Sequence, residues 1–173
     1  MTTIRRAVSR TCLGALLLAG AACSDKFLQV TNPNIIDAST VDPTSGAATL
    51  AASAQQNFAT AYGWLIMYGA WFTDEADVSD TFPTRNEFGF RVISDLNGSL
   101  NGDVWQPLSL ATASTKIVLD LQLPNPTTNI NLARAASFRG FSIEMMAETF
   151  CTGTLPKDLA TGGPELQTAA LLD

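Results

Sequence analysis

The sequence predicts an all-α protein made of stacked helical hairpins with long loops. Two segments, 103–123 and 129–150, place apolar side chains on two sides of a helix and leave only a narrow polar ridge between them. The connection between these segments is short and contains the helix-breaking stretch Pro124-Asn125-Pro126. A helix that is apolar on two sides must lie between neighbours. The pattern therefore favours antiparallel hairpins of the tetratricopeptide type, although no two copies align at a fixed period.

The first helix is predicted to begin at Asp42-Pro43, with Asp42 as the N-cap and Pro43 at the first helical position. An Ala-rich stretch follows through about Ala61. The helix either continues or bends near Gly63 into the run 62–72. Because this run is apolar all round, we expect it to be buried between other elements.

The segment after this run is acidic and then loop-like. Residues 81–101 contain Pro, Gly and Asn without sustained periodicity, which predicts a long loop with short turns or strand fragments, for example over 88–93. Four acidic residues supply oxygen atoms that suit calcium, but their spacing fits no EF-hand loop, so a solvated acidic segment is favoured over a calcium site. These residues are Asp74, Glu75, Asp77 and Asp80.

The next helix is predicted to begin at Asp103, in a capping-box-like arrangement with Gln106. In the helix over 129–150, Arg139 falls on an apolar face, so we expect a carboxylate or carbonyl partner rather than a ligand role. Glu144 and Glu148 lie one turn apart on the polar ridge, which is more typical of solvated surface than of an acid/base pair.

The last part of the chain predicts one further helix. Pro164 follows Gly162-Gly163 and would occupy a first helical position, with no stop signal before Asp173, so we expect the chain to be a piece of a longer protein. Cys151, beside Phe150, is interpreted as a small, partly buried core residue rather than a reactive thiol.

The N-terminus has the pattern of a bacterial export signal that ends at Cys23. A positive region precedes an apolar run over 11–18 that is too short to span a bilayer, and small residues follow it. Small residues that end on a cysteine resemble the lipobox of bacterial lipoproteins, in which the cysteine is diacylated and becomes the new N-terminus. The alternative is an ordinary thiol after a secretory cleavage site. We therefore expect a signal peptide at 1–22, a lipid-anchored tether at 23–40 and a helical domain at 41–173.

Composition excludes several classes of function. Without residues 1–22 the chain has 7 basic and 16 acidic residues, and the basic ones are scattered singly, which argues against nucleic-acid binding. There is no histidine, so His-based triads and His-ligated zinc are excluded. If Cys12 leaves with the signal and Cys23 carries lipid, Cys151 remains alone and no intramolecular disulfide is possible. No catalytic residue, metal ligand or cofactor site is predicted.

Four pieces, in order, resemble the N-terminal part of the SusD/RagB family of outer-membrane nutrient-uptake lipoproteins. They are the start Cys23-Ser24-Asp25-Lys26-Phe27-Leu28, the helix end Trp71-Phe72-Thr73-Asp74-Glu75, the helix opening at Trp105, and the Ala-rich helix 131–141 with the loop 150–156 that follows it. An Asp directly after the cysteine would resemble an inner-membrane retention signal. This position is Ser24, so the resemblance implies the outer membrane.

The resemblance implies a cell-surface helical scaffold that binds an oligosaccharide or other polymer and delivers it to a TonB-dependent barrel. Sugar sites stack aromatic faces on pyranose rings beside polar hydrogen-bonding groups. The candidate residues are Trp105, Phe82, Phe88, Phe90 and Asn86, although core packing is the more common role for each aromatic. Two alternatives are a lipid-anchored interaction scaffold without a glycan ligand and a secreted hydrolase that uses a pair of carboxylates.

Overall fold

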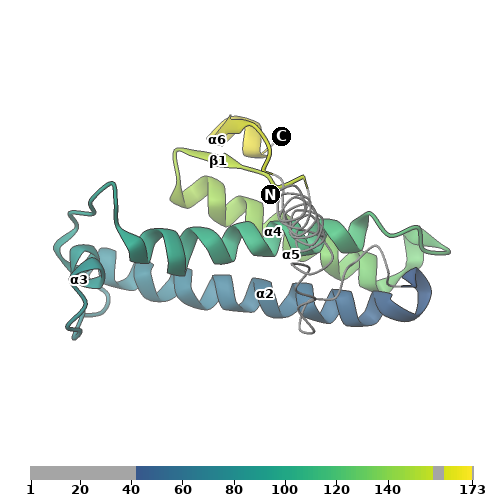
Figure 1. Ribbon diagram of the computed structural model, residues 1–173, viewed down its shortest axis with the longest axis horizontal. Helices are drawn as coiled ribbons and strands as arrows, with labels where there is room; N and C mark the ends of the chain where they lie inside the picture. The colour runs from purple at the N-terminus through teal and green to yellow at the C-terminus, as the bar shows by residue number, and fades with distance from the viewer. Residues whose placement is uncertain (1–41, 158–161, 173) are drawn as a thin grey trace, which may run out of the picture. The chain divides into compact units, whose positions relative to one another are not determined.

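Three long helices pack against one another to form the body of the protein: α2 (Pro43–Phe72), α4 (Gln106–Leu119) and α5 (Ile130–Thr149) (Figure 1). The computed structural model describes residues 42–157 and 162–172. The expected signal peptide, the lipid-attachment residue Cys23 and the tether lie outside these residues. The described chain is mostly helical with one small two-stranded sheet, so the all-α expectation is confirmed at that level.

Helix α2 begins as its sequence predicts. The Asp42 carboxylate accepts a hydrogen bond from the Ser45 amide at 2.8 Å, and this bond lowers the pKa of Asp42. The helix then runs without interruption through Gly63 and Gly69, so it continues rather than bends. A Cβ at either glycine would meet nothing within 4 Å, so close packing does not require them.

The expectation that the run 62–72 is buried all round was wrong. Tyr68 is fully buried, but Tyr62 and Ile66 remain about half exposed, at 49% and 51%. The physical reason is that the neighbours of α2, which are α4 and α5 along its length and α3 and η3 near its end, do not surround its whole circumference.

The segment 81–101 was also predicted incorrectly, because it contains a helix and no strand. Helix α3 (Pro83–Phe90) starts with proline in its first turn and ends at Arg91, which adopts the left-handed conformation with φ 57°. Hydrogen bonds from Ser94 and Asn97 to the Glu87 carboxylate hold this short helix in place. No strand forms over 88–93.

The next helix begins before Asp103. Asn97 caps it by accepting a hydrogen bond from the Leu100 amide at 2.7 Å, and a π-helical stretch, η3 (Leu100–Trp105), then leads into α4. Asp103 therefore lies inside the helix and is not its N-cap. The wider π turn lies directly before Pro107, whose ring would otherwise meet the carbonyl group of the preceding turn.

After α4, a 3-10 turn, η4 (Pro126–Thr128), connects to α5. The Asn129 side chain caps α5 by accepting from the Asn131 amide at 3.0 Å, which agrees with the predicted start of this helix. Arg139 donates from Nη1 to the carbonyl oxygen of Thr112 on α4 at 2.5 Å, so the expected carbonyl partner is confirmed. Burial lowers the pKa of this arginine.

The helix predicted from Pro164 is replaced by a strand. Strand β1 (Thr152–Thr154) pairs antiparallel with β2 (Glu165–Gln167), and α6 (Thr168–Leu172) begins only after β2. Gly153 lies so close to α5 and α6 that a Cβ there would come within 2.9 Å of Met146 Sδ. Pairing between distant segments therefore outcompetes the local helix signal.

Two clusters of buried residues show how the three helices run. One joins Ala51 and Ala54 of α2 with Val118 near the end of α4 and Ala135 near the start of α5. The other joins Tyr68 near the end of α2 with Val104 of η3 and Met146 near the end of α5. The helices thus run up, down and up, with α4 antiparallel to α2 and α5 (Figure 1).

Alanines let the helices approach closely, and Ala54 is fully buried at the first cluster. Ala54→Leu should therefore overpack this contact and lower the free energy of unfolding by about 1 to 3 kcal/mol. Urea denaturation of the two proteins measures this change. Ala52→Leu, at an exposed position of the same helix, is the matched control and should leave stability nearly unchanged.

Candidate binding cleft

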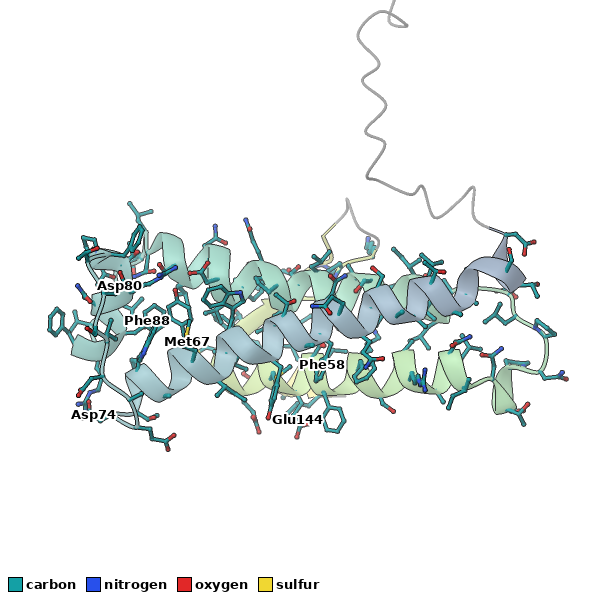
Figure 2. The ribbon with its side chains drawn as sticks, turned by 90° about the horizontal axis from the view of Figure 1, so that it is seen from below. Phe58, Met67, Asp74, Asp80, Phe88 and Glu144 are labelled. Carbon is teal, nitrogen blue, oxygen red and sulfur yellow. The ribbon has the colours of Figure 1, made fainter. Side chains whose placement is uncertain are left out.

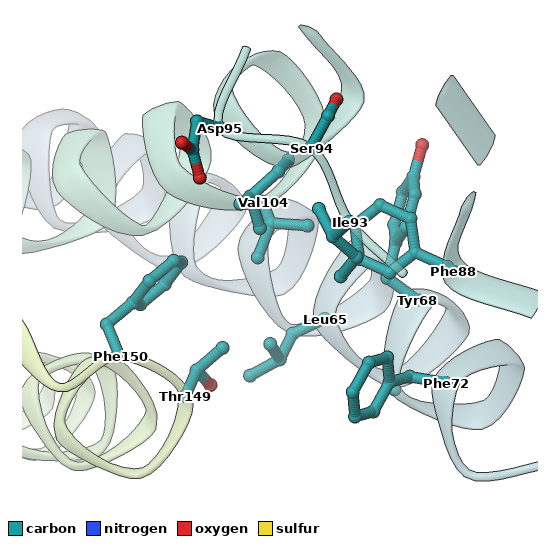
Figure 3. A pocket seen from close by; sticks show the side chains of 12 residues that line it. Leu65, Tyr68, Phe72, Phe88, Ile93, Ser94, Asp95, Val104, Thr149 and Phe150 are labelled. Atoms are coloured by element: carbon teal, nitrogen blue, oxygen red, sulfur yellow. The ribbon is translucent and has the colours of Figure 1, made fainter. Parts of the chain in front are cut away.

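An apolar cleft of about 480 Å³ lies near the ends of α2 and α5 (Figure 3). It lies between α2, α3, the connection that precedes η3, η3 itself and the end of α5. Its lining residues are Leu65, Tyr68, Gly69, Phe72, Phe88, Ile93, Ser94, Asp95, Leu100, Val104, Thr149 and Phe150.

The cleft combines an apolar interior with polar groups at its edge. Figure 3 shows the rings of Phe72 and Phe150 on opposite sides, with Ser94 and Asp95 together at one edge. Phe72 is 43% exposed, so part of its ring is accessible to a ligand. A concave apolar surface with a few polar groups at its edge is the common form of a small-molecule or sugar subsite.

Tyr68 forms the wall of the cleft between α2 and α3. Its ring packs edge-to-face on Phe88 and on Trp71, with centroid distances of 4.5 and 4.8 Å. Its hydroxyl donates a hydrogen bond to Asp103 Oδ2 at 2.5 Å. Burial, and then the bond to Asp103, raise the pKa of Tyr68, so the phenol stays protonated at neutral pH.

An ion-pair network lies beside this tyrosine. Arg85 on α3 contacts Asp80 at 2.7 Å and approaches Asp103 at 3.8 Å. Its guanidinium group also lies over the ring of Phe82, 4.9 Å from the centroid. The hydrogen bond from Arg85 is the main cause that lowers the pKa of Asp80. The network fixes α3 against η3 and so sets one wall of the cleft.

A second set of hydrogen bonds ties α3 to the start of the following helix. The Glu87 carboxylate accepts from the Ser94 amide at 2.8 Å and from the Asn97 side chain at 2.7 Å. Asn97 also donates to the Thr84 carbonyl oxygen at 2.8 Å, and the hydroxyls of Thr84 and Ser99 lie 2.8 Å apart. We call these hydrogen bonds of Glu87, Asn97 and Thr84 the clamp. They position the connection that carries Ser94 and Asp95.

The aromatic candidates from the sequence separate into two groups. Phe88 is buried and lines the cleft, and Trp105 packs edge-to-face on the lining residue Phe150 with centroids 5.1 Å apart. Phe82 and Phe90 are exposed and do not line the cleft, and neither does Asn86 on α3. Sequence reasoning missed Tyr68, Phe72, Ser94, Asp95 and Thr149, because they come from separate elements that only the fold brings together.

The other charged or reactive candidates lie on the surface. Asp74 pairs with Arg91, and Glu75 and Asp77 are exposed. Within residues 42–157 and 162–172, no group of three or more His, Cys, Asp or Glu side chains is placed to hold a metal ion. Glu144 and Glu148 are exposed on α5. The expectation of a partly buried Cys151 was wrong: this residue lies in the turn between α5 and β1, and it is exposed.

Comparisons of the chain with protein-family models, curated proteins and solved structures found no match. Among the described residues, no helix is both long and apolar enough to span a membrane. What the cleft can bind is therefore inferred from its own lining residues. It offers apolar contact, aromatic faces and hydrogen-bonding groups at one edge, which is an arrangement suited to binding.

The clamp at Glu87 makes stability depend on pH. The Ser94 amide, and then Asn97, lower the pKa of Glu87 below its ordinary value of 4.5. The stabilisation that the Glu87 carboxylate contributes is thus fully present above its ordinary pKa of 4.5. It is lost as the pH falls through the lowered pKa of the folded protein. Glu87→Gln should lower the Tm at about pH 7 and narrow the difference in Tm between about pH 7 and about pH 3.

Thermal unfolding followed by circular dichroism across this pH range measures both effects. Glu144→Gln is the matched control, since Glu144 is exposed and accepts no hydrogen bond from a side chain within the part of the chain that the structure describes. An unchanged pH profile for Glu87→Gln would show that the clamp does not stabilise the fold.

Proposed function

We propose that this chain is a lipid-anchored cell-surface protein of the SusD/RagB type, which binds a glycan or other polymeric nutrient and delivers it to a TonB-dependent barrel in the outer membrane. The observation that carries the proposal is the sequence pattern of an export signal that ends at Cys23, ahead of a helical body. Acyl chains such as palmitate on Cys23 would hold the body at the membrane, since each buried methylene contributes about 0.8 kcal/mol.

The arrangement of the body supports this proposal. Consecutive long helices α2, α4 and α5 run antiparallel in chain order, as the hairpins of tetratricopeptide-like scaffolds do. Two segments that carry the sequence resemblance, the end of α2 and the Ala-rich part of α5, are helical, whereas Trp105 lies inside a helix and does not open it. We include in the proposal that these helical hairpins stack on one another.

Within this proposal, the cleft is the glycan subsite of the described body. The exposed part of the Phe72 side chain is available for contact with a pyranose, while Ser94 and Asp95 offer hydrogen-bonding groups to sugar hydroxyls.

A second candidate function is a lipid-anchored protein-interaction scaffold. The specific observation in its favour is that α2 has no charged residue over 30 positions and still exposes Tyr62 and Ile66. Exposed apolar side chains on an uncharged helix are typical of surfaces that contact another protein.

Lipid attachment is tested by Cys23→Ala in cells. Because the acyl chains are the proposed anchor, the variant should move from the membrane fraction to the soluble fraction and lose incorporation of a labelled palmitate analogue. Cys151→Ala, at an exposed cysteine of the body, should leave both readouts unchanged. Retention of the Cys23→Ala protein in the membrane fraction would mean that another contact anchors the body.

Ligand capture is tested with the full chain on a panel of polysaccharides. Phe72→Ala should weaken binding of a recognised glycan by about tenfold, since a stacked aromatic contributes about 0.5 to 1.5 kcal/mol beyond the area that it buries. Phe90→Ala is the matched control, because Phe90 is 75% exposed and lies outside the cleft. Isothermal titration calorimetry measures both affinities.

The two candidate functions differ in what the protein brings down from native membranes. Recovery of a TonB-dependent barrel together with glycan binding supports the uptake proposal. Recovery of other proteins, with no glycan bound at any concentration, supports the scaffold.

A further inference from the structure

One face of the body, formed by α2 and α5, presents aromatic and aliphatic side chains to solvent. Tyr62 and Ile66 on α2 and Phe141 on α5 are each about half exposed. Phe58 lies beneath them, between the two helices, and stacks on Tyr62 and Phe138 with centroid distances of 6.0 and 4.9 Å (Figure 2). We call this surface, made of Tyr62, Ile66, Phe138 and Phe141, the α2–α5 face.

Charged side chains border this face in an ordered way. Arg134 lies two turns before Phe141 on α5, and Glu148 lies two turns after it. Both are exposed, and neither forms an ion pair with any residue that the structure describes. Glu144, which lies between Phe141 and Glu148 in the sequence, is exposed and projects outward from α5 (Figure 2).

The order Arg134, Phe141, Glu148 along α5 is complementary to the same order on a second, antiparallel copy of the helix. If a second α5 packs antiparallel on the first, with Phe141 at the two-fold axis, the residue seven positions before Phe141 lies opposite the residue seven positions after it. Arg134 of each copy then faces Glu148 of the other, and the two Phe141 rings meet at the centre. An isologous interface requires this kind of match between a surface and itself.

We infer that the α2–α5 face binds a second copy of this chain, to form a two-fold symmetric dimer with antiparallel α5 helices. The segment between Arg134 and Glu148 is about 21 Å long at 1.5 Å per residue, so the two ion pairs flank a centre made of Phe141, Phe138 and the exposed residues of α2, with the Glu144 carboxylate beside it. The uncharged α2 adds no charge that would oppose its symmetry mate. A lipid surface fits this face less well, because interfacial helices carry several Lys or Arg and this face has only Arg134.

A charge-reversal pair tests the inference in the full chain, purified in detergent and measured by analytical ultracentrifugation over a series of concentrations. Arg134→Glu places like charges opposite each other, so the dimer dissociation constant should rise by about tenfold or more. The double variant Arg134→Glu/Glu148→Arg restores opposite charges across the same contact and should return the constant close to that of the original protein. Lys157→Glu, at an exposed cation outside the face, is the matched control and should not change it.

The double variant separates pairing from folding, since damage to the helix by one substitution would not be repaired by the other. A full chain that stays monomeric at every concentration overturns the inference. Dimerisation that Arg134→Glu leaves unchanged, or that the double variant fails to restore, overturns it as well. The test needs neither acylation at Cys23 nor a glycan, so its failure is distinct from failure of the proposed function.

Discussion

The hydrogen bond from the Tyr68 hydroxyl to Asp103 is the contact on which the cleft end of the body depends. Tyr68 is only 1% exposed, and a phenol so deeply buried is costly to the fold unless its hydroxyl has a partner. Asp103 supplies this partner and also lies 3.8 Å from Arg85, which in turn bonds Asp80. One hydroxyl thus joins α2, η3 and α3, the three elements that form most of the cleft wall.

Capping patterns in the sequence predicted where helices begin, because a helix start depends on side chains within a few residues of it. Asp42 and Asn129 cap helices where the sequence places them, because an N-cap acts within three residues of itself. Asp103 shows the limit of this reasoning. It matches a capping pattern, but Asn97 caps the same helix earlier and Asp103 instead bonds a tyrosine 35 residues away.

The elements that sequence reasoning missed depend on contacts between separate segments of the chain. Helix α3 is held by Glu87 and its bonds to Ser94 and Asn97, which periodicity does not reveal. Strand β2 exists because β1 is available to pair with it, which overrides the helix signal at Pro164. The cleft was unpredictable for the same reason, since its residues come from several elements and share no spacing. The one signal available in advance was the aromatic density around Tyr68.

The two surfaces of the body are compatible with each other. Thr149, at the edge of the cleft, lies eight residues beyond Phe141 on α5, about 12 Å along the helix. In an antiparallel pair with Phe141 at its centre, the two clefts therefore lie at opposite ends, about 24 Å apart along the helix direction. A polymer long enough to reach both would bind the pair more tightly than a short oligomer, because the second contact becomes intramolecular once the first has formed. Pairing through the α2–α5 face would thus favour polymers over their short fragments without any change in the cleft.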